Sequence, residues 1–119
     1  MAAIDPRTRR LVGKAATGRN PVQVYATPDG RHLYVANQGT AKDPDNTVSV
    51  IAVDGLQTVA TITAGRGAHG VVVSDDGARA FISNIADNSV TVIDTASLKA
   101  VDTYKVGKGP NGITYRAAR

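Results

Sequence analysis

The sequence repeats itself, and this repeat constrains the fold more than any other feature of the 119 residues. Residues 18–37 match residues 65–84 when every number is raised by 47, and after a five-residue excess in the first copy the match continues with numbers raised by 42. Repeats of this length are single supersecondary units that need neighbouring copies to bury their apolar faces. Identical pairs include Gly18/Gly65, Arg19/Arg66, Val24/Val71, Asp29/Asp76, Gly30/Gly77, Asn37/Asn84, Asn46/Asn88, Val48/Val90 and Val50/Val92.

Each copy predicts four short β-strands joined by turns, which we name a, b, c and d in chain order. Asp29-Gly30 and Asp76-Gly77 separate strands a and b, and glycine there supplies the positive φ that a tight turn needs. The chain has fifteen Val and twelve Thr but only four Leu and no Glu, which favours strands over helices. The predicted strands are 22–26, 32–36, 47–53 and 58–63 in the first copy, and 70–74, 79–83, 89–93 and 100–106 in the second.

Strand c of both copies ends in two consecutive apolar residues, Val50-Ile51 and Val92-Ile93. A strand that is apolar on both faces belongs to a sheet that is covered on both sides. Four-stranded antiparallel sheets of this repeat length, stacked face to face, are the blades of a β-propeller. We therefore predict an all-β fold, a β-propeller fragment of about two and a half blades. Residues 1–18 form the last strand of a preceding blade in this interpretation, 18–64 and 65–106 the two blade repeats, and 107–119 the first strand of a following blade.

Strands b and c carry a family resemblance. The segment Tyr34-Val35-Ala36-Asn37, followed by Asn46-Thr47-Val48-Ser49-Val50-Ile51, resembles the YVTN repeat of β-propellers, with Ala in the Thr place. The second copy departs further, as Phe81-Ile82-Ser83-Asn84, and the resemblance covers about residues 4–115. Related propellers serve in microbial surface layers, as binding modules and as domains of periplasmic redox enzymes such as the haem-containing nitrite reductases. The resemblance implies a periplasmic or extracellular location, which the chain itself does not indicate.

The number of blades is too small for a closed ring, because propellers close with roughly four to eight blades. Two apolar blade faces are expected to be exposed, and such faces bind a partner or further blades. The favoured interpretation is the carboxy-terminal portion of a longer propeller. The alternative is a self-contained module that forms a homo-oligomer through its blade faces.

The connections between strand d and the next strand a carry a cation at the same repeat position, in Arg19, Arg66 and Lys108. Blades related by rotation would place these cations on an arc around one end of the channel. An arc of like charges focuses a positive potential, which suits a small anionic ligand or an acidic protein partner. The net charge of +4 permits this role without requiring it, since loop residues are often basic.

His69 is the single candidate for a cofactor contact, because it stands just before the innermost strand, near the expected mouth of the channel. The equivalent positions hold Val22 and Asn111, and one histidine is too few for a metal or haem site. We predict no cofactor and no metal site, and we place His69 and Asn111 with the three cations as candidate ligand-binding residues.

The other motifs are better explained as structure. The G-x-G-x-x-G segments 65–70 and 107–112 lead into predicted strands, whereas a dinucleotide site needs a helix at that place. Asp75 and Asp76 are adjacent carboxylates in a turn, which point apart instead of converging on one substrate atom. The chain has no cysteine, and we predict no catalytic residue. Nucleic-acid binding is disfavoured by 4% aromatic residues, and no apolar run is long enough for membrane insertion.

The sequence therefore predicts a non-catalytic binding or scaffolding module of a YVTN-type propeller. The first alternative is a piece of a periplasmic redox enzyme in which His69 lies near a haem or metal. The second is a structural repeat of a surface layer.

Overall fold

The computed structural model describes residues 1–118, and nearly all of its regular structure is β-strand. Its only helical element among those residues is a single 3-10 turn, η1 (Asp54–Leu56). The described residues contain no helix long and apolar enough to cross a membrane. The strands are β1 (Ala2–Asp5), β2 (Arg10–Lys14), β3 (Pro21–Ala26), β4 (His32–Gly39), β5 (Pro44–Ala52), β6 (Gln57–Thr63), β7 (Ala68–Val73), β8 (Arg79–Asn84), β9 (Ser89–Asp94) and β10 (Lys99–Lys105).

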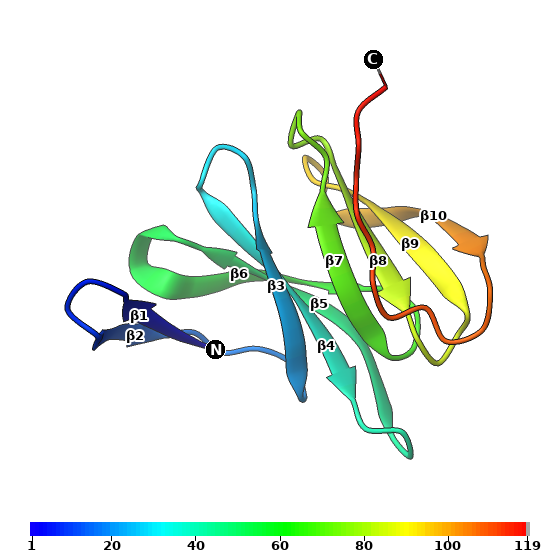
Figure 1. Cartoon of the computed structure of the whole chain (residues 1–119), viewed down its shortest axis with the longest axis horizontal. Helices are drawn as coiled ribbons and strands as arrows, with labels where there is room; N and C mark the ends of the chain where they lie inside the picture. The colour runs from blue at the N-terminus through cyan, green and yellow to red at the C-terminus, as the bar shows by residue number, and fades with distance from the viewer. Residues whose placement is uncertain (119) are drawn as a thin grey trace.

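Three antiparallel sheets spread like a fan, with the pair β1-β2 on one side and the two four-stranded sheets beside it (Figure 1). The strand orders β3-β4-β5-β6 and β7-β8-β9-β10 follow the chain, so each repeat forms one blade. Strands β3 and β7, the first of each blade, lie beside one another, and the Gln23 side-chain amide bonds both backbone groups of Val71 at 3.3 and 3.4 Å. The predicted all-β class and the eight blade strands are confirmed.

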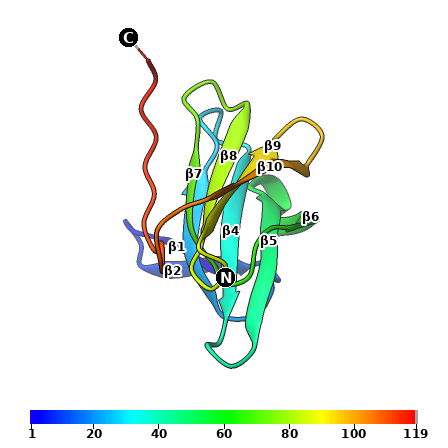
Figure 2. The same ribbon diagram turned by 90° about the vertical axis from the view of Figure 1, so that its right-hand side faces the viewer.

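The two ends of the chain differ from the sequence prediction. Residues 1–18 hold two strands where one was predicted, because Asp5 pairs with Arg10 across a tight turn and Ala2 with Lys14. The segment 107–119 was predicted as the first strand of a following blade; residues 107–118 join no ladder among the described residues, and residue 119 lies outside them. Residues 107–118 nevertheless follow the second blade (Figures 1 and 2), and Tyr115 stacks on Phe81 with ring centroids 5.7 Å apart.

The main core lies between the two blades, and it is built from one face of each. Alternation along a strand sends neighbouring residues to opposite faces, so Tyr34 and Val50 face the second blade while Val35 and Ile51 face the β1-β2 pair. This explains why strand c is apolar on both sides. The buried residues of the inter-blade core are Tyr34, Ala36, Val48, Val50, Ile62, Ala68, Val71, Val73, Ala80, Ile82 and Ile93.

A buried asparagine stands in the last part of strand b in each blade, as Asn37 in β4 and as the final residue Asn84 in β8, and it explains the most regular identities of the repeat. Asn84 is wholly buried, and its side-chain amide donates to the hydroxyls of Ser89 and Thr91 at 3.0 and 2.9 Å. The side-chain oxygen of Asn84, Oδ1, accepts a hydrogen bond from the backbone N–H of Gly65 at 3.1 Å. A Cβ added at Gly65 would lie only 2.6 Å from this side chain, so the loop can approach the asparagine only with glycine.

We predict that Gly65→Ala destabilises the protein by about 1–3 kcal/mol, because the new methyl group must displace the buried Asn84 amide from its bonds. Gly107 is the matched control, since it holds the same repeat position and a Cβ there meets nothing within 4 Å. Urea unfolding should give Gly107→Ala a free energy of unfolding within about 1 kcal/mol of the parent. Equal effects of the two substitutions would show that the Gly–Asn contact is not what holds this loop.

Candidate functional site

The loops before each strand a and the loops between strands b and c meet at one end of the blades, which we call the loop end. The backbone N–H of Arg19 donates to Asp45 and that of Arg66 donates to Asp87, both at 2.8 Å. The two blades are also joined here, because the N–H of Gly67 donates to the carbonyl of Asp45 at 2.7 Å. Aspartate at an equivalent position therefore fixes both cation-bearing loops.

The three predicted cations are not equivalent in the structure. Arg19 forms ion pairs with Asp43 and Asp45, which belong to the segment that is longer in the first repeat. Arg66 and Lys108 are exposed, and neither side chain has an ion pair among residues 1–118. The additional carboxylate of the first blade thus neutralises one cation of the predicted arc and leaves the other two open to solvent.

His69 occupies a β-bulge at the start of β7, because Ala68 pairs with Asn84 and Gly70 with Ser83, leaving His69 between them without a partner residue. Val22 has the same place in β3, so the bulge is a property of the repeat. A bulge redirects one side chain out of the ladder. Asn111, the candidate ligand-binding residue at the equivalent repeat position, is exposed, and its backbone carbonyl oxygen lies 3.3 Å from the position that a Cβ of Gly70 would take. The fold therefore brings the Asn111 backbone close to the chain at His69.

No cluster of metal-ligating side chains is found among the described residues. Across residues 1–118, no group of three or more His or Asp side chains is placed to hold a metal ion. The Nδ1 atom of His69 is buried without a hydrogen-bond partner. A ligating histidine normally donates its second ring nitrogen to a carboxylate or carbonyl, which fixes the ring, and His69 lacks that support within the described part of the chain.

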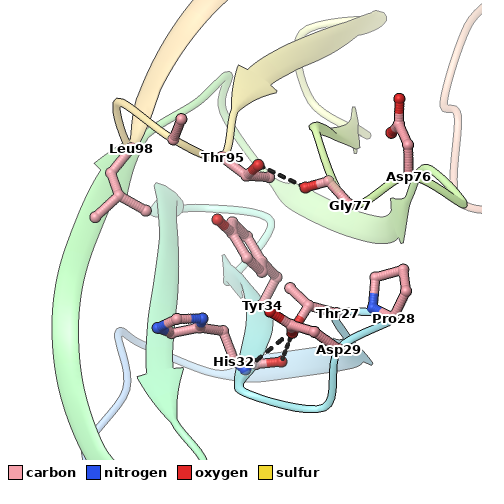
Figure 3. Close-up of a pocket in the computed structure, with 10 residues that line it drawn as sticks. Thr27, Pro28, Asp29, His32, Tyr34, Asp76, Gly77, Thr95 and Leu98 are labelled. Carbon is pink, nitrogen blue, oxygen red and sulfur yellow. Dashed lines mark hydrogen bonds between the residues drawn. The ribbon is translucent and has the colours of Figure 1, made fainter.

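The opposite end of the blades, which we call the turn end, holds a pocket of about 640 Å³ between the two blades. It lies where the a–b turns of both blades approach each other and where the c–d turn of the second blade faces Tyr34 (Figure 3). This pocket was not predicted from the sequence, in which the Tyr34/Phe81 difference at one repeat position is the one signal that could have indicated it. The lining residues are Thr27, Pro28, Asp29, His32, Tyr34, Asp76, Gly77, Thr95, Ala96 and Leu98.

The carboxylates at the turn end are held by the a–b turns, in the same way in both blades. The hydroxyls of Thr27 and Ser74 donate at 2.6 Å to Oδ1 of Asp29 and Asp76. These bonds, helped by the backbone N–H groups of Arg31 and Ala78, lower the pKa of both carboxyls below the ordinary aspartate value. Both carboxylates are therefore ionised at neutral pH. Their predicted role as turn formers is confirmed, with Gly30 and Gly77 at φ of 70° and 72°.

Comparison with known proteins identifies the architecture. Neither a family model nor a curated protein matches the sequence. Among solved structures, the hydrazine synthase of Kuenenia stuttgartiensis superposes with a TM-score of 0.84 and 30% identity, over 93% of this chain and 31% of that one. The WD40 repeats of RRP9 superpose with a TM-score of 0.67 and 12% identity, over 79% of this chain and 28% of that one. The fold is that of a β-propeller.

A second redox protein belongs to the same set of propellers. Dihydro-heme d1 dehydrogenase NirN, solved in complex with DHE, matches 93% of this chain with a TM-score of 0.74 and 18% identity. This chain covers 24% of NirN and 31% of the hydrazine synthase, so it spans a third or less of the length of these propeller proteins. The propellers that it resembles include redox enzymes as well as WD40 proteins.

We predict that Ser74→Ala raises the pKa of Asp76 toward the ordinary value, because the Ser74 hydroxyl is the main group that lowers it. Carboxyl carbon NMR of a pH titration measures this shift, and Ser83→Ala, which removes a hydroxyl elsewhere in the blade, should leave the Asp76 titration in place.

The same substitution has a defined effect on stability against pH. A pKa lowered by folding stabilises the protein above the pKa of the unfolded chain, and this contribution disappears as the pH falls through the folded pKa. The stability difference between parent and Ser74→Ala should therefore be largest near neutral pH and narrow in acid. It does not vanish, because Ser74 also accepts from the Arg79 backbone at 3.0 Å. If the difference in free energy of unfolding between parent and Ser74→Ala grew as the pH fell, Ser74 would not be the group that lowers the Asp76 pKa.

Proposed function

We propose that the chain is part of a propeller that binds an anionic ligand or an acidic protein segment at its loop end, without catalysing a reaction on it. The observation that carries the proposal is the exposure of Arg66 and Lys108 at the same repeat position, with no ion pair for either among residues 1–118. Asn111 is exposed in the loop that follows Lys108 and adds a side-chain amide that can donate to an anion.

The loop backbones support this role because they are fixed before any ligand binds. Asp87 holds the N–H of Arg66, and Asn88 accepts from the N–H of Gly109 at 2.9 Å. Side chains displayed from a rigid framework lose less entropy on binding than side chains displayed from a mobile loop. The Arg19 charge is already compensated by Asp43, so we assign the larger part of the attraction to the second and third loops.

We predict that Arg66→Glu combined with Lys108→Glu weakens binding of a hexaglutamate peptide by roughly tenfold at low salt, because two attractive charges become repulsive. The parent affinity should fall as salt is added, and the variant should lose most of this dependence. Isothermal titration calorimetry at two salt concentrations measures both effects.

The control is Arg10→Glu combined with Lys14→Glu, which changes the net charge equally but lies on exposed positions of β2. It should retain most of the parent affinity. If both double variants lost the same affinity for hexaglutamate, the net charge alone would explain binding, and a site at the loop end would be contradicted.

The second candidate is a propeller segment of a redox enzyme in which His69 borders a haem. The 30% identity with a hydrazine synthase favours it, whereas the unsupported Nδ1 of His69 does not. Adding haem to the protein should give no shift of the Soret band that depends on His69. A shift that appears in the parent and is lost in His69→Ala would favour this candidate over the binding module.

A further inference from the structure

We propose that the pocket at the turn end is a binding site for a small organic cation, an ammonium or guanidinium group on a short apolar body. The pocket is separate from the loop end, because it lies at the other end of the strands and its lining does not include Arg66, Lys108 or His69. Its lining comes from both blades of this chain.

Tyr34 is the residue that points to a ligand. The residue is only 1% exposed, and its hydroxyl has no hydrogen bond with any described residue and extends into the space below Thr95 and Leu98 (Figure 3). The buried side-chain atoms that lack a partner within residues 1–118 are Asn37 Oδ1 and His69 Nδ1, so the Tyr34 oxygen is instead reached from the pocket and is free to bond a ligand there. Burial, and the neighbouring charge of Asp94, raise the pKa of Tyr34, so the hydroxyl remains protonated and can both donate and accept.

The repeat shows that packing does not require this hydroxyl. Phe81 stands at the same repeat position in the second blade, where a phenyl ring fills the place of the phenol. Phe81 faces Tyr115 of the C-terminal segment, while Tyr34 faces the pocket. The oxygen atom of Tyr34 therefore adds a polar group to the pocket and nothing to the core that phenylalanine would not supply.

Charge selects a cation. The lining contains the ionised carboxylates of Asp29 and Asp76, and His32 is its only basic side chain. Each carboxylate uses Oδ1 in its turn and leaves Oδ2 without a hydrogen bond to the described residues. Asp76 lies at the rim with its carboxylate directed away from Tyr34, so it acts through its field (Figure 3).

The arginines nearest to these carboxylates lie outside the lining. Arg79 is paired with Asp94, and the Arg31 side chain is exposed. Their charges help to lower the pKa of Asp76 and of Asp29, but neither places a cation in the pocket. The protein as a whole has a net charge of +4, so a lining with two carboxylates is the reverse of its average surface.

The walls favour an organic cation over a metal ion. Pro28, Ala96 and Leu98 contribute apolar surface that suits the apolar body of such a ligand. A divalent metal would need several convergent oxygen or nitrogen ligands, and no group of three such side chains occurs in residues 1–118. A volume of about 640 Å³ lies in the range of small-molecule sites.

The experiment uses benzylammonium as the probe and benzyl alcohol as its neutral counterpart, followed by amide NMR of the whole chain. Benzylammonium should shift the amide signals of Gly77 and Ala96, which line the pocket, and benzyl alcohol should bind at least fivefold more weakly. Tyr34→Phe should weaken the benzylammonium affinity about fivefold, the value of one lost hydrogen bond. Asp29→Asn, which keeps the Oδ1 acceptor of the turn, should weaken it to a similar extent.

Matched controls separate the pocket from general effects. Tyr104→Phe removes an exposed phenol on β10, and Asp75→Asn removes a carboxylate next to Asp76 that is outside the lining. Both should bind benzylammonium like the parent. The proposal is overturned if the alcohol binds as well as the ammonium, if Tyr34→Phe binds unchanged, or if the pocket amides do not respond. None of these outcomes depends on binding of hexaglutamate at the loop end.

Discussion

The burial of one blade face against the next is the constraint on which the rest of the structure depends. A single four-stranded sheet of this size exposes both of its faces, and each face here is apolar. Stacking removes one face of each sheet from water, with Tyr34 and Val50 on one side and Val71 and Ile82 on the other. The position of every loop follows, because the blades can meet in this way only when their inner strands lie side by side.

The Asn–Gly contact determines how that stack is joined at the loop end. Asn84 donates to two hydroxyls of strand c and accepts from one loop N–H. Asn37 likewise donates to the hydroxyls of Thr47 and Ser49, both at 3.0 Å. The two networks differ at the loop, because the Gly65 N–H donates to Asn84 whereas the Gly18 N–H donates to Ser49 and Oδ1 of Asn37 has no partner among the described residues. In the second blade the asparagine therefore holds the loop that carries Arg66 directly.

The two ends of the blades have different chemistry although they are built by the same repeat. Exposed cations stand at the loop end, whereas the turn end has hydrogen-bonded carboxylates and the Tyr34 hydroxyl. The repeat gives each blade the same framework, and the two ends differ in chemistry because of the few positions at which the repeats differ. The longer b–c loop of the first blade supplies Asp43, which pairs with Arg19. The Tyr34/Phe81 difference places a phenol at this repeat position in the first blade and a phenyl ring in the second.

The sequence by itself determined the all-β class, the eight blade strands and the turn role of Asp29 and Asp76, because these follow from local periodicity and from spacing along the chain. At the two ends the local pattern did not decide the strands, because a strand there depends on the partner with which it pairs. It also could not show that Arg19 is compensated or that a pocket forms beside Tyr34. Arg19 and Asp43 are 24 positions apart and meet through the folding of the first blade, whereas Tyr34 and Leu98 are 64 positions apart and meet only because one blade packs on the other.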